Sequence, residues 1–300
     1  MRRARATYQG AYHHIMNRGI RDIDIFSDME LRDNFIKLLG EKSGKLKIKL
    51  LAYCLMSNHY HLILQNSSNK LSEFMKQLNG HFGIIYCKKA GNRGYVFQGR
   101  YKSTLIQEGA YLQMAIAYVL LNPVRAGIAD NPYKYKWSSI TDYYSSGDSI
   151  VDKEFVEDLF QSREVLNEFL EDWSGKDIPV RNTRFGKLIC DEGYIDKAIQ
   201  KFNRRNKNKE TKRRRKNDYI LQPVEKVIEE YEENKKIKIS QIDVNSLKGK
   251  KLRSELLVYL KDRTGLKYSE IIKYPLFQTL KLSSLGKTYK RAKKRLRKEG

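Results

Sequence analysis

A strongly basic segment in the second half of the chain sets the main limit on how the chain can fold. Residues 201–218 hold ten Lys and Arg against two acids, with almost no apolar side chains. A segment of this composition cannot bury a hydrophobic core, so we predict a linker or solvated arm there. The chain therefore has to fold as separate parts on either side of it, and 300 residues suffice for more than one domain.

The whole chain is also basic, with 59 Lys and Arg against 35 Asp and Glu and a formal net charge of +24. Such a chain repels itself unless a polyanion is near, so nucleic acid is the leading class of partner. The cysteines, Cys54, Cys87 and Cys190, form no CxxC motif, which indicates a reducing compartment and argues against structural zinc. No signal-peptide core and no membrane-length apolar run is visible, so we expect a cytoplasmic protein without a membrane partner.

The balance of acidic and basic residues also differs between other parts of the chain. Residues 146–200 carry thirteen acids against seven Lys and Arg, whereas the last twenty residues carry nine Lys and Arg against one acid. We therefore predict a first domain at 1–145, an acidic helical extension at 146–200, the linker at 201–218 and a C-terminal domain at 219–300.

The first domain alternates between strand-like and helix-like stretches. Strand-like runs occupy residues 11–17, 46–56, 59–64 and 94–107, and helical apolar spacing occupies residues 29–39, 71–88 and 108–121. Ser57 and Asn58 predict a turn that joins the second and third strands in a hairpin, and Ser68 or Asn69 is the expected cap of the second helix. This order predicts an α+β fold, a small antiparallel sheet with helices packed on it.

Two of the five histidines lie two residues apart on a predicted strand. Successive strand side chains point to opposite faces, so His59 and His61 share one face. Two adjacent imidazoles can chelate a divalent metal, with a polar group from another element completing the site. A pair of ordinary surface histidines is the alternative. The apolar neighbours of the pair place it at the centre of the sheet, where polar side chains need a reason.

Tyr118 and Asn122 lie four residues apart in YVLLNPVRAG, so they share one face of the predicted helix. That helix should end at Asn122, because Pro123 follows it. A tyrosine hydroxyl beside a metal-bound phosphate can attack phosphorus and form a covalent phosphotyrosine. The chain contains 20 tyrosines, however, and composition alone does not choose Tyr118 over Tyr86 or Tyr111.

Three motifs together resemble a known family. SNHYHLIL resembles the HUH signature (His, bulky hydrophobic, His), and YVLLNPVRAG looks like the tyrosine-helix motif of the REP-associated tyrosine transposases. GYVFQGRYKS, between them, is similar to the hairpin of the same family. The resemblance covers about Tyr8 to Tyr144. It implies a single-tyrosine HUH domain with a ferredoxin- or RRM-like sandwich, which cuts and rejoins single-stranded or hairpin DNA without ATP.

The resemblance also implies roles for particular residues. His59 and His61 match the metal pair, and Tyr118 matches the nucleophile that forms a 5′-phosphotyrosine bond. Asn122 takes the place of a third metal-facing side chain. Many relatives carry Gln there, so the shorter amide has to approach the metal more closely. Histidines accept zinc or manganese and phosphate cleavage usually runs on magnesium or manganese, so we expect Mg²⁺ or Mn²⁺.

Arg100 and Lys102 in FQGRYKS fit the handling of phosphates, and Gly99 lets a DNA backbone come close. An ordinary solvated hairpin is the alternative. Tyr101 or Phe97 could stack on an unpaired base, although aromatic residues on strands are more often part of the core.

The C-terminal domain has an all-α basic pattern. Apolar residues at helical spacing predict a helix that ends near Gly265, a short helix at 268–273, and a final helix capped by Ser283 or Ser284. This order is similar to the helix-turn-helix domain of the replication initiator DnaA. The expected DNA contacts are Lys287, Lys290, Arg291 and Lys294. A basic bundle that only adheres to phosphates is the alternative.

Two classes of function stay open. The first is a transposase that cleaves DNA through Tyr118, and the presence of His59 and His61 favours it. The second is a non-catalytic regulator of the same fold that recognises hairpin DNA. A replication or conjugation nickase is disfavoured by the tyrosine-helix motif and by the lack of a helicase segment, and no P-loop or GxSxG motif occurs. The sequence is compatible with a monomer or a homodimer.

Overall fold

The computed structural model describes residues 6–91, 93–183, 186–205 and 221–299, and most of the predicted linker at 201–218 lies outside them. The chain divides into two compact units. The first comprises residues 1–181 and 185–211, and the second comprises residues 182–184 and 212–300. Within the described residues, no helix has the length and apolar character needed to cross a membrane.

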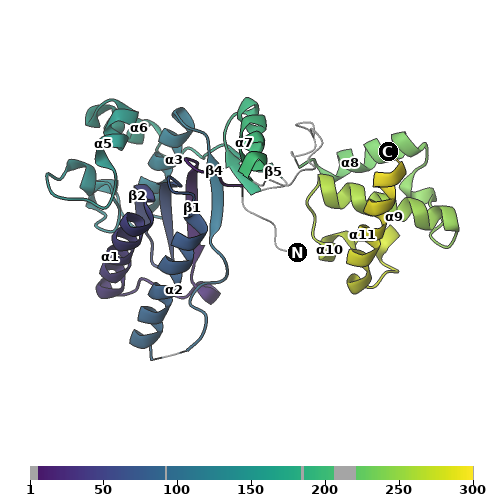
Figure 1. Cartoon of the computed structure of the whole chain (residues 1–300), viewed down its shortest axis with the longest axis horizontal. Coiled ribbons are helices and arrows are strands. Elements are labelled where there is room, and N and C mark those ends of the chain that lie inside the picture. The colour runs from purple at the N-terminus through teal and green to yellow at the C-terminus, as the bar shows by residue number, and fades with distance from the viewer. Residues whose placement is uncertain (1–5, 92, 184–185, 206–220, 300) are drawn as a thin grey trace. The chain divides into compact units, whose positions relative to one another are not determined.

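The first unit is built on a mixed sheet (Figure 1). Its first four strands are β1 (Tyr12–Arg18), β2 (Lys49–Leu55), β3 (His59–Gln65) and β4 (Lys102–Ile106). The strand order is β2-β3-β1-β4-β6-β5, and the pairs among β1 to β4 are antiparallel. The predicted hairpin is β2–β3. The α+β class and the predicted order of strands and helices are confirmed.

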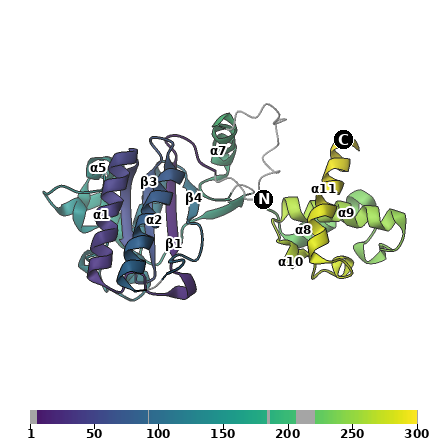
Figure 2. The ribbon, with the colours of Figure 1, turned by 60° about the horizontal axis from the view of Figure 1, so that its bottom comes forward.

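Helices cover both faces of this sheet. Figure 2 shows α1 (Met29–Leu46) and α2 (Leu71–Lys89) side by side over one face. Tyr60 of β3 points toward them, since its ring lies 4.8 Å from the ring of Phe35 in α1. The helix α3 (Ala110–Leu120) contacts β2, β3 and β4 on the other face. Because side chains alternate along a strand, His59 and His61 point toward α3.

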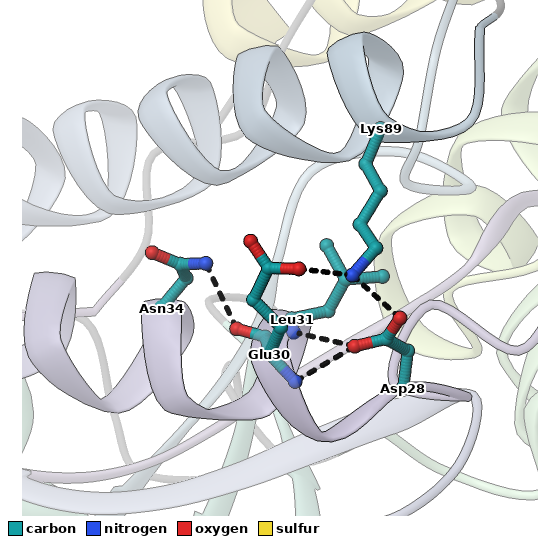
Figure 3. A network of polar contacts seen from close by, with 5 residues as sticks. All are labelled: Asp28, Glu30, Leu31, Asn34 and Lys89. Carbon is teal, nitrogen blue, oxygen red and sulfur yellow. Dashed lines mark hydrogen bonds and ion pairs between the residues drawn. The ribbon is translucent and has the colours of Figure 1, made fainter.

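A polar network ties α1 to α2 (Figure 3). The Asp28 carboxylate caps α1 by accepting hydrogen bonds from the backbone N–H groups of Glu30 (2.7 Å) and Leu31 (3.3 Å). Lys89, in the last turn of α2, forms ion pairs with Asp28 and Glu30. The end of α2 is thereby fixed to the beginning of α1.

The start of α2 and the segment before β4 differ from the sequence prediction. The buried Asn66 side chain, not Ser68 or Asn69, accepts a hydrogen bond from the first N–H of the helix, that of Leu71 (3.0 Å). Ser68 instead donates to the carbonyl of Leu46. Only the end of the predicted strand at 94–107 is regular, because the residues before Lys102 form a loop around a bridge between Gly19 and Phe97.

Residues 146–200 contain the predicted helices and, in addition, two strands. The elements are α5 (Lys153–Phe160), α6 (Arg163–Asp172), β5 (Val180–Thr183), β6 (Gly186–Ile189) and α7 (Glu192–Arg205). The strand β6 runs parallel to β4 and extends the sheet. Buried Phe160 and Leu166 belong to the same core as the first four strands. The first unit also holds the short helices η1 (Ile20–Asp22), α4 (Asn122–Arg125), η2 (Pro132–Lys134) and η3 (Thr141–Tyr144).

The second unit is helical, as predicted. It contains α8 (Val224–Lys235), η5 (Ile239–Gln241), α9 (Leu247–Arg263), α10 (Tyr268–Ile271), η6 (Pro275–Phe277) and α11 (Leu282–Glu299). Its core includes fully buried Tyr231, Leu257 and Leu285. The predicted serine cap of α11 is wrong, because Ser283 and Ser284 lie inside its first turn and Ser284 donates to the carbonyl of Lys281 (2.7 Å).

Candidate active site and nucleic-acid interface

His59 and His61 form a pair on β3, with ring centroids 4.9 Å apart. His61 is buried, at 4% exposure, and His59 is half-buried. Each uses its Nδ1 atom for a hydrogen bond, His59 with Asn58 Oδ1 (2.7 Å) and His61 with His14 Nε2 (2.8 Å). Such bonds orient an imidazole ring and leave Nε2 as the nitrogen that it offers to a ligand.

His14 is a third imidazole at this place. Only one of the adjacent His13 and His14 can face α3, and the strand register assigns that position to His14, whose Cα partner is Ile63. His13 points to the opposite face, where it bonds to the hydroxyls of Thr7 (2.9 Å) and Ser103 (3.1 Å). His14 therefore belongs to the site, and His13 belongs to the packing beneath the sheet.

Burial lowers the pKa of all three imidazoles that face α3. Burial lowers the pKa of His14 to about 4. Burial also lowers the pKa of His61 well below its usual value, with a further contribution from the neighbouring His14 and His59. The pKa of His59 is lowered by burial and then by the charge of Arg18. A neutral imidazole keeps its lone pair, which is what metal coordination requires.

Tyr118 lies on α3 above these rings. Its ring centroid is 6.3 Å from that of His61 and 6.0 Å from that of His14, and the side chain is half-buried. The competing tyrosines lie elsewhere. Tyr86 is on α2, which covers the opposite face, and Tyr111 is about two turns earlier on α3. Of the three candidates, Tyr118 is the one that the fold places beside the histidine pair.

The helix α3 ends at Leu120, as the proline at 123 led us to expect, and the separate short helix α4 begins at Asn122. The N–H of Arg125 donates to the carbonyl of Leu121 (2.9 Å). The side chain of Asn122 is half-buried, and its Nδ2 donates to the carbonyl of Tyr118 (2.7 Å). This bond fixes the amide one turn beyond Tyr118 and leaves Oδ1 as the atom that can face a ligand.

Arg125 is a residue of the site that the sequence did not single out. Its guanidinium lies 5.1 Å from the ring centroid of Tyr118. It also donates to the carbonyl of Lys176 (2.8 Å) and pairs with Asp177 (2.5 Å), both beyond α6. The signal for it is its place seven residues after Tyr118, which is the same helix face only if the helix continues through Pro123.

Among the described residues, no group of three or more His, Cys, Asp and Glu side chains is arranged to hold a metal ion. Imidazole nitrogens and amide oxygens can both bind divalent metals. His59, His61 and Asn122 could therefore supply two nitrogens and one oxygen, with water or substrate oxygens at the remaining positions.

The two predicted phosphate-binding residues of the first unit occupy different places. Lys102 and His61 both have Met16 as their Cα partner, so the three residues form a row across β3, β1 and β4 on the face of α3. Lys102 is exposed at the end of that row. Arg100 is exposed in the loop before β4, where it lines a pocket beside α2.

The predicted cations of the second unit share one exposed face of α11. Lys287, Lys290, Arg291 and Lys294 are spaced by three and four residues, and all four are exposed. Neighbouring cations of the same helix are engaged, because Lys293 pairs with Asp262 (2.6 Å) and Arg295 with Glu255 (3.5 Å). We call the four exposed residues the α11 stripe.

The chain shows similarity to two solved structures and to one protein family. No curated protein matches the chain. A solved structure described as the REP-associated tyrosine transposase bound to a REP hairpin is 14% identical, with a TM-score of 0.40 over 51% of this chain and 93% of that one. A second, described as a candidate transposase from Deinococcus radiodurans R1, is 17% identical, with a TM-score of 0.29 over 43% and 92%.

A family model described as Transposase IS200 like matches residues 7–121. The match includes β1 to β4, α3, the histidine pair and Tyr118, and it ends one residue before Asn122. The segment from Thr7 to Leu121, less than half of the chain, is therefore similar to the IS200-like transposases.

Proposed function

We propose that this protein is a transposase that cleaves and rejoins single-stranded or hairpin DNA, with Tyr118 as the nucleophile. The observation that carries the proposal is the position of the Tyr118 ring about 6 Å from the rings of His14 and His61. A phosphate held beside the histidine pair would lie within reach of the Tyr118 hydroxyl.

In the proposed reaction the Tyr118 oxygen forms a bond to phosphorus while the bond from phosphorus to the 3′ oxygen breaks. Tyrosine loses its proton and the 3′ oxygen gains one, so the products are a 5′-phosphotyrosine and a free 3′-hydroxyl. The phosphodiester is exchanged for another phosphodiester. The reverse step, attack by a 3′-hydroxyl on the phosphotyrosine, therefore rejoins the strand without ATP.

We further propose that His59, His61 and Asn122 hold Mg²⁺ or Mn²⁺. When bound, the metal would act as a Lewis acid on a non-bridging phosphate oxygen. The protein's own contribution is to keep both imidazoles neutral by burial and to fix their orientation through Asn58 and His14. Manganese suits the nitrogen donors better than magnesium does.

Binding of DNA would divide between the two units. Lys102 lies in the same row as His61 and would contact the backbone next to the cleaved phosphate. The α11 stripe would contact other phosphates of the DNA backbone, as the basic helix of a helix-turn-helix domain does. The net charge of +24 favours both contacts.

A non-catalytic DNA-binding protein is the second candidate, because the α11 stripe serves binding whether or not chemistry follows. The test is to incubate the full chain and Mn²⁺ with labelled hairpin DNA and to look for a covalent adduct on a denaturing gel. We expect an adduct whose tryptic peptide carries the nucleotide on Tyr118.

The matched variant is Tyr118→Phe, which removes the attacking oxygen and keeps the ring. We expect it to bind DNA like the parent and to form no adduct. A nucleotide found on Tyr111, Tyr86 or a serine would show that the active site is elsewhere. A parent protein that binds hairpin DNA tightly without any adduct would favour the non-catalytic candidate.

A further inference from the structure

A pocket of about 890 Å³ lies between α2 and the loop before β4, and the proposed reaction makes no use of it. This volume is within the usual range of small-ligand sites. We call it the α2 pocket. Its lining includes Lys76, Gly80 and Gly83 from α2, and Arg93, Tyr95 and Arg100 from the loop.

Two glycines inside α2 give the pocket its depth. A glycine in a helix interior costs about 1 kcal/mol relative to alanine, so its presence needs a reason. Packing does not supply one. A Cβ atom at Gly80 would meet nothing within 4 Å, and one at Gly83 would meet only Val96, at 3.8 Å. The two glycines therefore leave part of the α2 surface at the pocket without side chains.

Two large apolar side chains of the pocket are exposed. Tyr95 is 88% exposed and Ile84 is 68% exposed. The residues beneath them are fixed, since Met75 and Val96 are buried and the Phe97 ring packs 6.1 Å from that of Phe82. The pocket therefore combines a rigid apolar floor with an aromatic ring that has a face available for stacking.

The charge around the pocket has one sign. Lys76, Arg93 and Arg100 are exposed lining residues, and none of the described residues that line the pocket is acidic. An apolar floor within a cationic rim is complementary to a ligand with an apolar ring and a phosphate. A purely hydrophobic protein surface would gain nothing from the three cations.

The loop of the pocket is also joined to the strand beside the candidate site. The N–H of Gln98 donates to the carbonyl of Arg18 (2.9 Å), and the Cα partner of Arg18 on β3 is His59. Asn17, next to Arg18, donates to the carbonyl of Gly99. The pocket wall thus continues the end of the sheet at which the histidine pair lies.

We propose that the α2 pocket takes one unpaired nucleobase of the DNA substrate, stacked on Tyr95 above the glycine surface, with adjacent phosphates on Lys76, Arg93 and Arg100. The inference rests on the proposed function for the identity of the polymer. It adds a base-binding position outside the reacting phosphate. Stacking of one base on an aromatic side chain contributes about 1–3 kcal/mol and tolerates any base.

Gly80→Leu tests the inference, because Gly80 lines the pocket, a Cβ atom there meets nothing within 4 Å, and the longer side chain would occupy pocket volume. The probes are a short oligothymidylate and an abasic oligonucleotide of equal length, which share phosphates and differ in bases. We expect Gly80→Leu to weaken oligothymidylate binding about tenfold and to leave abasic binding unchanged. Tyr95→Ala should show the same selectivity. Equal losses on both probes, or none, would overturn the proposal.

The matched control is Gly44→Leu, on the exposed side of α1, where a Cβ atom also meets nothing within 4 Å. It should bind both probes like the parent. Thermal unfolding at or above the parental midpoint would show that Gly80→Leu is folded, as its higher helix propensity leads us to expect.

Photocrosslinking locates the base directly. An oligonucleotide with 5-iodouracil should crosslink to Tyr95 in the parent and lose that crosslink in Gly80→Leu. Adduct formation on Tyr118 is measured separately with the hairpin substrate. An adduct in the parent with no effect of Gly80→Leu would reject the base pocket alone. A base-selective effect of Gly80→Leu without any adduct would reject the proposed chemistry alone.

Discussion

The two units of this protein place their polar residues in opposite ways. In the first unit the candidate site is made of side chains that the fold withdraws from solvent, including His61 at 4% exposure and half-buried Tyr118. In the second unit the candidate DNA contacts of the α11 stripe are all exposed. The first arrangement is suited to holding reacting groups in a fixed geometry, and the second is suited to contacting a charged polymer.

Within the second unit, cations in internal ion pairs differ in the same way from the exposed cations of the α11 stripe. Glu255 is only 3% exposed, and it pairs with Lys235 (2.8 Å) and Arg295 (3.5 Å). A buried carboxylate of this kind needs its partners, so these two cations serve the fold. The candidate DNA contacts are therefore the exposed cations without such internal pairs, such as the α11 stripe, and not all basic residues of the unit.

The largest effect should come from the withdrawn site. We expect His59→Ala to reduce the rate of adduct formation by about 100-fold or more. Loss of a residue that only orients a metal ligand costs roughly 10- to 100-fold in metal affinity or activity, and loss of the ligand itself should cost more. DNA affinity should change less than about twofold, because phosphate contacts come from cations elsewhere. The measurement is the single-turnover rate with Mn²⁺ and saturating hairpin DNA.

The control is His81→Ala, which removes an exposed histidine from α2. It should cleave at the parental rate. If His59→Ala also cleaves at that rate, the histidine pair does not hold a metal that the reaction needs. The proposed active site in the first unit would then be rejected.

DNA affinity should fall about tenfold when two cations of the α11 stripe are removed. The double variant Lys287→Ala/Lys290→Ala removes two phosphate contacts, so the salt dependence of binding to single strands should become shallower by about 1.4 in log–log slope. The adduct rate at saturating DNA should stay unchanged, because the stripe is in the other unit. Fluorescence anisotropy at several salt concentrations measures the slope.

Lys226→Ala/Lys250→Ala is the charge-matched control, with two exposed lysines removed from α8 and α9. An equal change of slope in both double variants would mean that the second unit contributes net charge and no defined face. That outcome would favour the simple basic bundle over a helix-turn-helix mode of binding.

Much of the first unit could be predicted because its signals are local. The alternation around His59 and His61 gives their shared face directly, since a strand has a period of two. The strands β5 and β6 could not be predicted in this way. Each has four residues, too few for a periodic pattern, and β6 is ordered by pairing with β4, about eighty residues earlier.

In the candidate site, too, residues in local motifs could be predicted, whereas contacts that depend on long-range packing could not. Tyr118 could be proposed from a motif, but its distance from the histidines depends on how α3 packs across the sheet. Asn66, which precedes the expected caps Ser68 and Asn69, takes their place because its side chain reaches the N–H of Leu71. Arg125 depends on a helix that continues past a proline and on a contact with Lys176, fifty-one residues away. Contacts between residues so far apart in the sequence produce no periodic pattern from which they could be predicted.

The smallest effect should come from Arg125, where the acidic extension meets the candidate site. A cation over an aromatic ring contributes about 0.5–1 kcal/mol at an exposed position, so Arg125→Gln should slow adduct formation about threefold. Arg125→Lys keeps the charge and should recover most of the rate. If Arg125 orients Tyr118 and Asp177 acts only through its ion pair with Arg125, Asp177→Asn should change the rate less than Arg125→Gln does. Equal effects of Arg125→Gln and Arg125→Lys would instead assign the role to the bonds with Lys176 and Asp177, and the extension would then act as a brace for the tyrosine helix.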